Sequence, residues 1–263
     1  MSPNGLAANE FLYELPAKKK LTDLILPKLV RQGCAQFLEE HHKADLLRAH
    51  QLAPRHRALL SGPPGNGKTS VAEALAQALD VPYFVVRYDR LIAGTLSETM
   101  ARVGLLFDYV RPQRCVLFFD EFDTVGKERG DPHDAADLKR AVGPLLVHID
   151  TLPPHVVIVT ATNHLELLDH AVWRRFQIRL HLPRPTRTQV EAWFAQMELP
   201  EEYNPTVIAH RLFEASFAEL EDFRDDLLRR RILAGPNADM NAIVRERLSQ
   251  WSRRMIPAGY GRM

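Results

Sequence analysis

The sequence predicts an α/β protein with a parallel five-stranded sheet covered by helices on both faces, followed by a small all-helical domain. Two observations predict this fold class. Short apolar runs alternate with longer stretches of helical periodicity up to about residue 184, and beyond that residue no strand-like run occurs. Strands that are apolar along their whole length are typical of a parallel sheet that is buried on both faces.

The elements follow in order along the chain. Residues 1–20 mix Pro, Gly and Asn with three lysines, and we expect them to form an arm. Residues 21–50 carry apolar side chains at helical spacing, which predicts an amphipathic helix. These side chains are Leu26, Leu29, Val30, Phe37 and Leu38. The predicted strands are 57–62, 83–88, 115–123, 155–163 and 177–183, and the predicted helices between them are 69–80, 97–111 and 137–149.

A cluster of Pro and Arg near residue 184 predicts a domain boundary. The predicted helices after it are 188–197, 217–233 and 238–255. We therefore expect three parts: the arm 1–20, a nucleotide-binding α/β domain 21–184, and a helical lid domain with a C-terminal tail, 185–263.

The composition limits the class of function. A net charge of +1 with 25% charged residues gives no global basic field of the kind that a nucleic-acid-binding protein carries. Cys34 and Cys115 cannot form a disulfide framework, and no zinc-binding spacing occurs. The N-terminus lacks a signal-peptide pattern, and charges interrupt every apolar run before it reaches the span of a bilayer. We expect a soluble, cytoplasmic protein without membrane contact.

The stretch GPPGNGKTS, residues 62–70, predicts a phosphate-binding loop. Gly62, Gly67, Lys68 and Thr69 satisfy the pattern G-x-x-x-x-G-K-[ST] between an apolar strand and a helix. Glycines let backbone N–H groups turn toward phosphate oxygens, the lysine reaches the β and γ phosphates, and the threonine hydroxyl binds Mg²⁺. The loop therefore predicts ATP and Mg²⁺ as ligands, in a sheet of the P-loop NTPase type.

The stretch VLFFDEFD, residues 116–123, extends the prediction from binding to hydrolysis. Asp120 ends a buried apolar strand and is placed to hold the Mg²⁺ shell, with Glu121 beside it. Neighbouring residues of an extended chain point to opposite sides, so Glu121 can face the attacking water and orient or deprotonate it. A small-molecule kinase, which transfers the phosphate to a metabolite, is the alternative that the loop alone leaves open.

Two later positions complete the candidate site. Asn163 ends a further buried strand, where its amide can bind the γ-phosphate or the water. Arg174 and Arg175 can neutralise charge on a γ-phosphate, but residues this far along the chain would more easily reach the nucleotide of a neighbouring subunit. That interpretation predicts subunits arranged head to tail.

These motifs, taken in order, resemble the AAA family of the AAA+ ATPases from about Leu21 to about Arg231. GPPGNGKTS looks like the family's Walker A motif, VLFFDEFD like Walker B, TATN like sensor 1, and LDHAVWRRF like the second region of homology. The resemblance implies that Asp120 binds Mg²⁺, Glu121 activates water, Asn163 is the sensor, and Arg174 and Arg175 are arginine fingers. The nucleotide-binding residues that it implies are Gly62, Pro63, Pro64, Gly65, Asn66, Gly67, Lys68, Thr69 and Ser70, with Asp23, Leu24 and Ala218 as weaker candidates.

The sequence departs from the family's pattern in its first pore loop. Family members that thread polypeptide usually carry an aromatic-hydrophobic-glycine triplet there, whereas this chain has Thr95, Leu96 and Ser97. The favoured function is ATP hydrolysis that drives the remodelling of a protein partner. We expect the chain to form a homo-oligomeric ring, a hexamer, which acts on a protein substrate directly or through an adaptor. The alternative, not favoured, is a switch of the loader or transposition-regulator type that ATP assembles on DNA, for which residues 227–233 and 251–263 are modest basic candidates.

Overall fold

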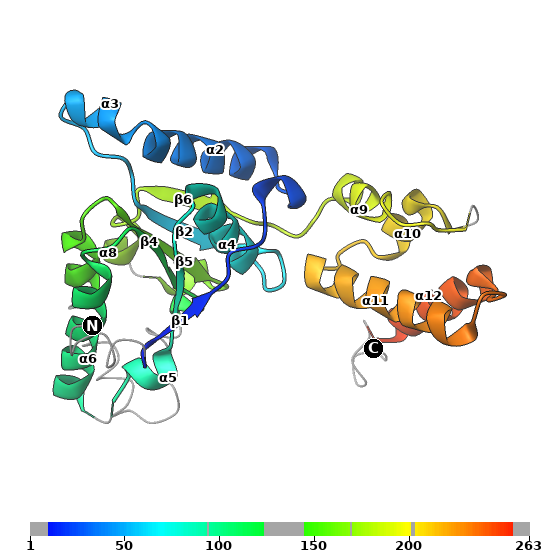
Figure 1. Ribbon diagram of the computed structural model, residues 1–263. Coiled ribbons are helices and arrows are strands. Elements are labelled where there is room, and N and C mark those ends of the chain that lie inside the picture. Colours follow the sequence, from blue (N-terminus) through cyan, green and yellow to red (C-terminus); the bar gives the residue numbers. More distant parts are fainter. Residues whose placement is uncertain (1–9, 94, 124–144, 169, 201–202, 255–263) are drawn as a thin grey trace. The chain divides into compact units, whose positions relative to one another are not determined.

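The computed structural model describes residues 10–93, 95–123, 145–168, 170–200 and 203–254 (Figure 1). The chain divides into two compact units, residues 1–63 with 67–182 and residues 64–66 with 183–263.

The first unit is built on a sheet of six strands within the described residues, in the order β1-β3-β4-β5-β2-β6. Five strands run parallel, which confirms the predicted α/β class, and β1 adds a sixth strand that pairs antiparallel with β3 at the sheet edge. The strand bounds are β1 Leu12–Leu15, β2 Arg57–Ser61, β3 Tyr83–Val86, β4 Cys115–Phe119, β5 Val156–Thr162 and β6 Ile178–His181.

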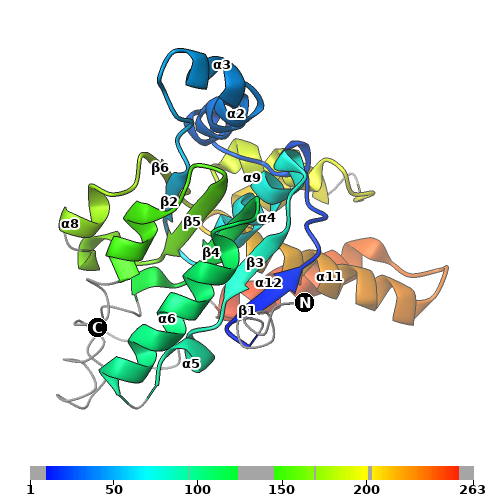
Figure 2. The same cartoon turned by 60° about the vertical axis from the view of Figure 1, so that its left-hand side comes forward.

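Helices cover both faces of this sheet, as predicted (Figures 1 and 2). The helices of the first unit are α2 Lys28–His42, α3 Ala44–Ala49, α4 Lys68–Leu79, α5 Tyr88–Leu91, α6 Leu96–Val110, residues 145–151 and α8 His170–Trp173, with the short 3-10 turns η1 Leu21–Asp23 and η3 Leu165–Leu167.

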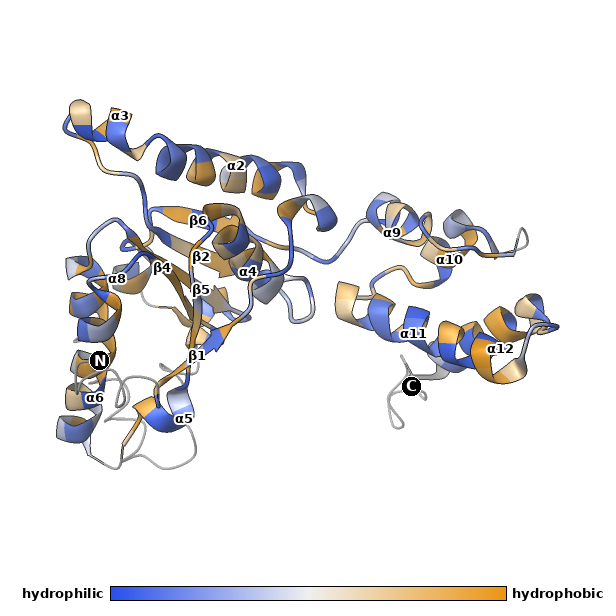
Figure 3. Cartoon of the chain, in the orientation of Figure 1, coloured by the Kyte–Doolittle hydropathy of each residue, from blue (hydrophilic) through white to orange (hydrophobic). Residues whose placement is uncertain are grey.

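The side chains of strand β4 alternate between the two faces of the sheet. Leu117 and Phe119 belong to the core packed beneath α6, whereas Val116 and Phe118 belong to the core packed beneath α2 and α4. All four side chains are fully buried. Successive side chains of a strand point to opposite faces, so a central parallel strand must be apolar at every position. Figure 3 shows the central strands β2, β4 and β5 as apolar, in contrast to the mixed surface of α2.

Helix α2 is amphipathic as predicted, but its buried stripe includes Cys34 and excludes Leu29. Val30, Cys34 and Phe37 are buried against α4, while Leu29 is 79% exposed. Positions 30, 34 and 37 follow the i, i+4, i+7 spacing of one helix face, and Leu29 lies about 100° away from it. The expected inward position of Leu29 was therefore wrong.

The segment predicted as an arm pairs with the sheet through β1 and is hydrogen-bonded to α4. Besides β1, the backbone amides of Lys18 and Lys19 both donate to Glu73 Oε1 at 3.0 Å. Lys19 Nζ donates to Ser70 Oγ at 2.7 Å. Two of the three lysines of this segment therefore link it to the first turns of α4.

The second unit is a helical domain. Its helices are α9 Arg187–Phe194, α10 Pro205–Arg211, α11 Phe217–Ala234 and α12 Met240–Arg254. Thr186 and Ser216 form capping boxes that start α9 and α11, and Asn204 caps α10. Phe194 and Phe223 lie edge to face in the core of this unit. In the described part of both units, no helix combines the length and apolar character needed to cross a membrane.

Candidate functional site

The loop 62–70 joins β2 to α4 and contains the buried ammonium group of Lys68. Lys68 is the first residue of α4 and is 7% exposed. Its Nζ donates to the carbonyl oxygens of Gly62 at 2.7 Å and Pro63 at 2.9 Å. Burial lowers the pKa of Lys68, and the negative charges of Asp120 and Asp123 act in the opposite direction. A buried ammonium at the start of a helix, where backbone N–H groups lack helical partners, suits a phosphate group.

Two glycines give the loop its shape for different reasons. Gly67 caps α4 with φ 84°, a left-handed conformation that side chains other than glycine rarely adopt. Gly62 has φ 137°, and a Cβ atom there would lie 2.1 Å from the carbonyl oxygen of Leu182. Gly62 therefore allows the close approach of the segment that follows β6, where Leu182 N also donates to Ser61 O at 2.8 Å.

The remaining loop residues differ in exposure. Pro64 and Gly65 are exposed, Pro63 and Ser70 are half-buried, and Asn66 is buried.

The two predicted Mg²⁺ ligands lie together. Thr69 Oγ1, in the first turn of α4, donates to Asp120 Oδ2 at 3.0 Å, directly after the end of β4. A hydroxyl and a carboxylate are oxygen ligands of the kind that Mg²⁺ prefers, and each leaves room for water and phosphate oxygens. The residues present therefore fit the ion, and Thr69 and Asp120 would hold it.

Glu121 is positioned by a turn and not by an extended strand. The strand ends at Phe119, Glu121 N donates to Asp120 Oδ1 at 2.9 Å, and Glu121 has φ 46°. A left-handed conformation is uncommon for a glutamate, and such residues cluster at functional sites. The expectation that Asp120 and Glu121 point apart because the chain is extended was wrong, although the Glu121 side chain is exposed and adjacent to the candidate Mg²⁺ ligands.

Asp123 connects the end of β4 with the end of β5, and the sequence analysis assigned it no role. Its side chain is 4% exposed. Its Oδ1 accepts hydrogen bonds from Thr162 Oγ1 at 2.9 Å and from Asn163 N at 3.3 Å. Thr162 Oγ1 in turn accepts from His164 N at 3.0 Å. Asn163 is therefore held at the same sheet edge as Asp120. The residue is half-buried, and its buried Oδ1 has no hydrogen-bond partner among the described residues.

The two arginines lie at the opposite edge of the sheet. Arg175 Nε donates to Asp150 Oδ2 at 2.8 Å, and Asp150 also pairs with Arg57, the first residue of β2. The loop follows Ser61, the last residue of β2, so the Arg57 end lies about 13 Å from it along the strand at about 3.3 Å per residue. Arg174 is exposed. Neither arginine is brought together with the loop of its own chain.

The weaker candidates lie in three further places. Asp23 ends η1, where its carboxylate accepts from the Thr22 hydroxyl at 3.1 Å. Leu24 is half-buried against the core that contains α4. Ala218 lies in the first turn of α11, in the second unit. Thr95 and Leu96, which the resemblance places in the first pore loop, are the N-cap and first residue of α6.

Sequence reasoning missed Asp123 and Asp150. Asp123 is the last residue of the stretch VLFFDEFD. Its acidic side chain, close behind an apolar strand, was the signal that could have identified it. No local signal marks Asp150, because its partner Arg175 lies 25 residues further along the chain.

Comparisons with known proteins identify a family for this chain. The family described as "ATPase family associated with various cellular activities (AAA)" matches residues 58–184. The chain is similar to y4kL of Sinorhizobium fredii, named an uncharacterized AAA family ATPase, with 36% identity over 82% of this chain and 66% of the relative.

Two further relatives match a smaller share. The human ATP-dependent zinc metalloprotease YME1L1 is 34% identical over 62% of this chain and 22% of its own length. The cell division cycle protein 48 homolog of Archaeoglobus fulgidus is 31% identical over 69% of this chain and 25% of its own length. The chain thus spans about two thirds of the first relative and a quarter or less of the other two.

Proposed function

Because this chain belongs to the AAA family of ATPases, we propose that it binds ATP with Mg²⁺ at the loop 62–70, hydrolyses it, and uses the energy to remodel a protein partner. The observation that carries the proposal is the hydrogen bond of 3.0 Å between Thr69 and Asp120, which joins the loop to the end of β4. Asn163 lies at the end of the neighbouring strand β5.

Each residue of this edge has a chemical task in the proposal. The N–H groups at the start of α4 and the Lys68 ammonium bind the phosphates, and Thr69 and Asp120 hold Mg²⁺. The ion neutralises negative charge on the phosphate oxygens. Glu121 orients the attacking water and takes its proton on a carboxylate oxygen, and the Asn163 amide fixes the water or the γ-phosphate.

The position of Arg174 supports a homo-oligomer. An exposed guanidinium at the sheet edge opposite to the loop cannot easily serve its own nucleotide, but it can serve that of a neighbour in a head-to-tail arrangement. A head-to-tail interface generates a ring when its rotation closes. We therefore propose a ring, with six subunits as the expected number, in which Arg174 acts on the adjacent subunit and Asp150 anchors Arg175.

The test is the mass of the Glu121→Gln variant, measured by sedimentation across protein concentration with Mg-ATP and with ADP. A six-subunit species that forms only with ATP supports the ring. A monomer with both nucleotides removes the neighbour that Arg174 requires and contradicts it. Transfer of the phosphate to a metabolite would instead identify a kinase.

One observation keeps the DNA-assembled switch as a second candidate. Residues 228–234 of α11 are exposed all round, and Arg229 and Arg230 have no ion-pair partner in the described part of the chain. Exposed arginines can bind phosphates of a duplex. DNA binding that weakens steeply with salt, and weakens further in the Arg229→Gln, Arg230→Gln double variant, would favour this candidate.

A further inference from the structure

A cavity lies in the first unit, at the amino-terminal edge of the sheet. Its volume is about 480 Å³, and it is enclosed by the end of α2, by α3, and by the residues that begin β4 and β5. Strand β4 is five residues long, from Cys115 at the cavity to Phe119 beside Asp120. At about 3.3 Å per residue its ends lie about 13 Å apart. The cavity is therefore separate from the nucleotide loop.

The lining of this cavity has an apolar part and a basic part. Leu79, Val81 and Val157 contribute apolar surface. The polar lining residues are His41, His42, Asp45, Arg48, Arg114 and His155. Five of these six can carry positive charge, and the one acidic residue, Asp45, is already paired with Arg48.

Arg114 is the second arginine of this lining, beside Arg48. No carboxylate pairs with its guanidinium in the part of the chain that the structure describes, and the side chain is exposed. An arginine presents a planar fork of donors that matches a carboxylate or phosphate group. Arg114 is therefore available to an anion that enters the cavity.

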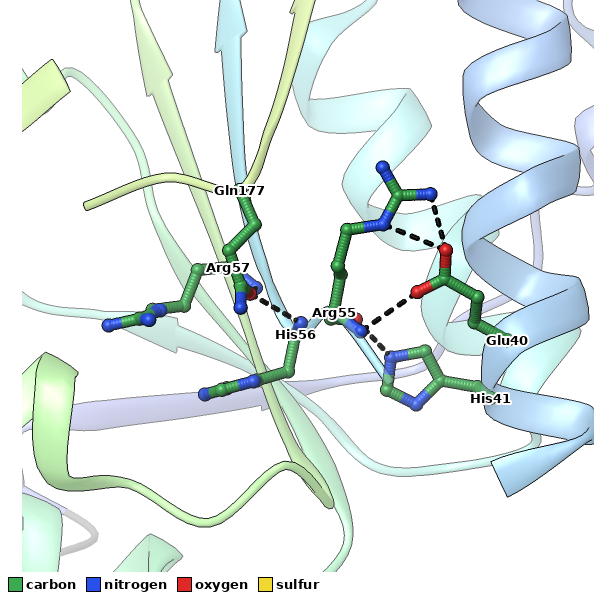
Figure 4. Close-up of polar contacts among 6 residues, drawn as sticks. All are labelled: Glu40, His41, Arg55, His56, Arg57 and Gln177. Atoms are coloured by element: carbon green, nitrogen blue, oxygen red, sulfur yellow. Dashed lines mark hydrogen bonds and ion pairs between the residues drawn. The ribbon is translucent and has the colours of Figure 1, made fainter. Parts of the chain in front are cut away.

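The wall of the cavity beside α2 is held in place by hydrogen bonds (Figure 4). Glu40 accepts from the backbone N of Arg55 at 2.9 Å and from its Nε at 2.8 Å. His41 Nε2 lies 2.7 Å from the Arg55 carbonyl oxygen, which can only accept, so Nε2 carries the proton. The imidazole of His41 is thus a fixed part of the wall.

The local potential is positive even without protonation of this imidazole. Burial lowers the pKa of His41, and the charges of Arg114 and His42 lower it further, although the Arg55 carbonyl and Glu40 act in the opposite direction. A neutral His41 leaves the two arginines as the fixed positive charges of the lining. Arg48 is paired with Asp45, whereas Arg114 has no ion-pair partner among the residues that the structure describes.

We propose that this cavity binds a small organic anion, with an apolar body against Leu79, Val81 and Val157 and a phosphate or carboxylate group paired with Arg114. The volume lies within the range of sites for small molecules, and such sites combine an apolar lining with a few polar groups. The site is distinct from the ATP site, so a regulatory metabolite and ATP can be bound together.

The test is a titration by ligand-detected NMR with phenyl phosphate, phenylacetate and the neutral benzyl alcohol. The full chain is saturated with Mg-ADP, which occupies the nucleotide loop. Both anions or one of them should bind saturably, and benzyl alcohol should bind at least about tenfold more weakly, the effect expected for a charge-assisted hydrogen bond. A preference between the two anions identifies the phosphate or the carboxylate as the native group.

Three variants locate the binding. Arg114→Gln should weaken anion binding about tenfold or more, and Ala53→Phe, at an exposed lining residue, should block the cavity without a change of charge. Arg90→Gln is the matched control, because it removes an exposed arginine of the same unit away from the cavity. The proposal is overturned if no anion binds or if benzyl alcohol binds as tightly as the anions. It is also overturned if the Arg114→Gln and Ala53→Phe variants both bind the anion with the same affinity as the wild-type protein.

Discussion

Replacement of Asp123 by Asn tests whether the link between β4 and β5 positions the catalytic groups. Asp123 is almost fully buried, and one of its oxygens accepts from both the Thr162 hydroxyl and the Asn163 amide. Asn has the same shape and can still offer one oxygen to both donors, but it carries no charge. The substitution therefore weakens two charge-assisted hydrogen bonds without opening a cavity.

The magnitude follows from these two bonds. A hydrogen bond to a charged group contributes about 1 kcal/mol more than a neutral one, so the pair loses about 2 kcal/mol. If the whole loss falls on the transition state, kcat decreases about 30-fold. Binding of ATP should change less, because the substitution leaves the Lys68 ammonium and its contacts with the loop carbonyls in place.

The assay is steady-state ATP hydrolysis combined with nucleotide binding by calorimetry. Asp89→Asn is the matched control, since Asp89 is an exposed carboxylate of the same unit that pairs with Arg87. Thr162→Val removes one of the two donors, so Asp123→Asn and Thr162→Val should be non-additive in kcat. Unchanged turnover in Asp123→Asn, or full additivity in the double variant, would refute the positioning role.

Four further predictions address the site and the fold. Lys68→Ala should abolish ATP binding, because it removes the buried ammonium of the loop; tight binding by calorimetry would contradict the loop assignment. Glu121→Gln should bind ATP but hardly hydrolyse it, and an unchanged kcat would move the catalytic role elsewhere. Arg174→Ala should lower kcat about 10³-fold or more at protein concentrations that allow assembly, with ATP binding retained; equal kcat in both proteins would exclude a trans-acting finger. Burial, and next the charge of Arg57, lower the pKa of His56 to about 4, so its protonation favours the unfolded chain and stability is lost as the pH falls below about 6.5. The loss should be on the order of 2 kcal/mol at pH 5 in urea unfolding, and His56→Leu, which cannot titrate, should show a shallower pH dependence.

The apolar strands and the loop could be predicted from the sequence because their causes are local. Every position of β4 faces a helix layer, and this leaves an uninterrupted apolar run that identifies a buried parallel strand. The pattern of Gly67, Lys68 and Thr69 likewise specifies a left-handed cap followed by a helix. In both cases the residues that determine the structure are neighbours in the sequence.

The features that could not be predicted depend on residues distant in the sequence. Strand β1 exists because β3 offers it a pairing edge, and four residues of mixed polarity give no signal of that partner. Asp150 anchors Arg175 across two separate elements. The left-handed turn at Glu121 is likewise not encoded by its residue type, which disfavours that conformation.

The close contact between Gly62 and Leu182 bears on how genetic variation in this chain should be interpreted. Any side chain at position 62 would collide with a backbone carbonyl that cannot move without disturbing β6. A Gly62 variant would consequently be short-lived in the cell through misfolding, whatever its intrinsic affinity for nucleotide. Such a variant would be classed with those that lose ATPase activity. Lower growth temperature or chaperones should restore the folded protein in a Gly62 variant, but should not restore activity in Lys68→Ala.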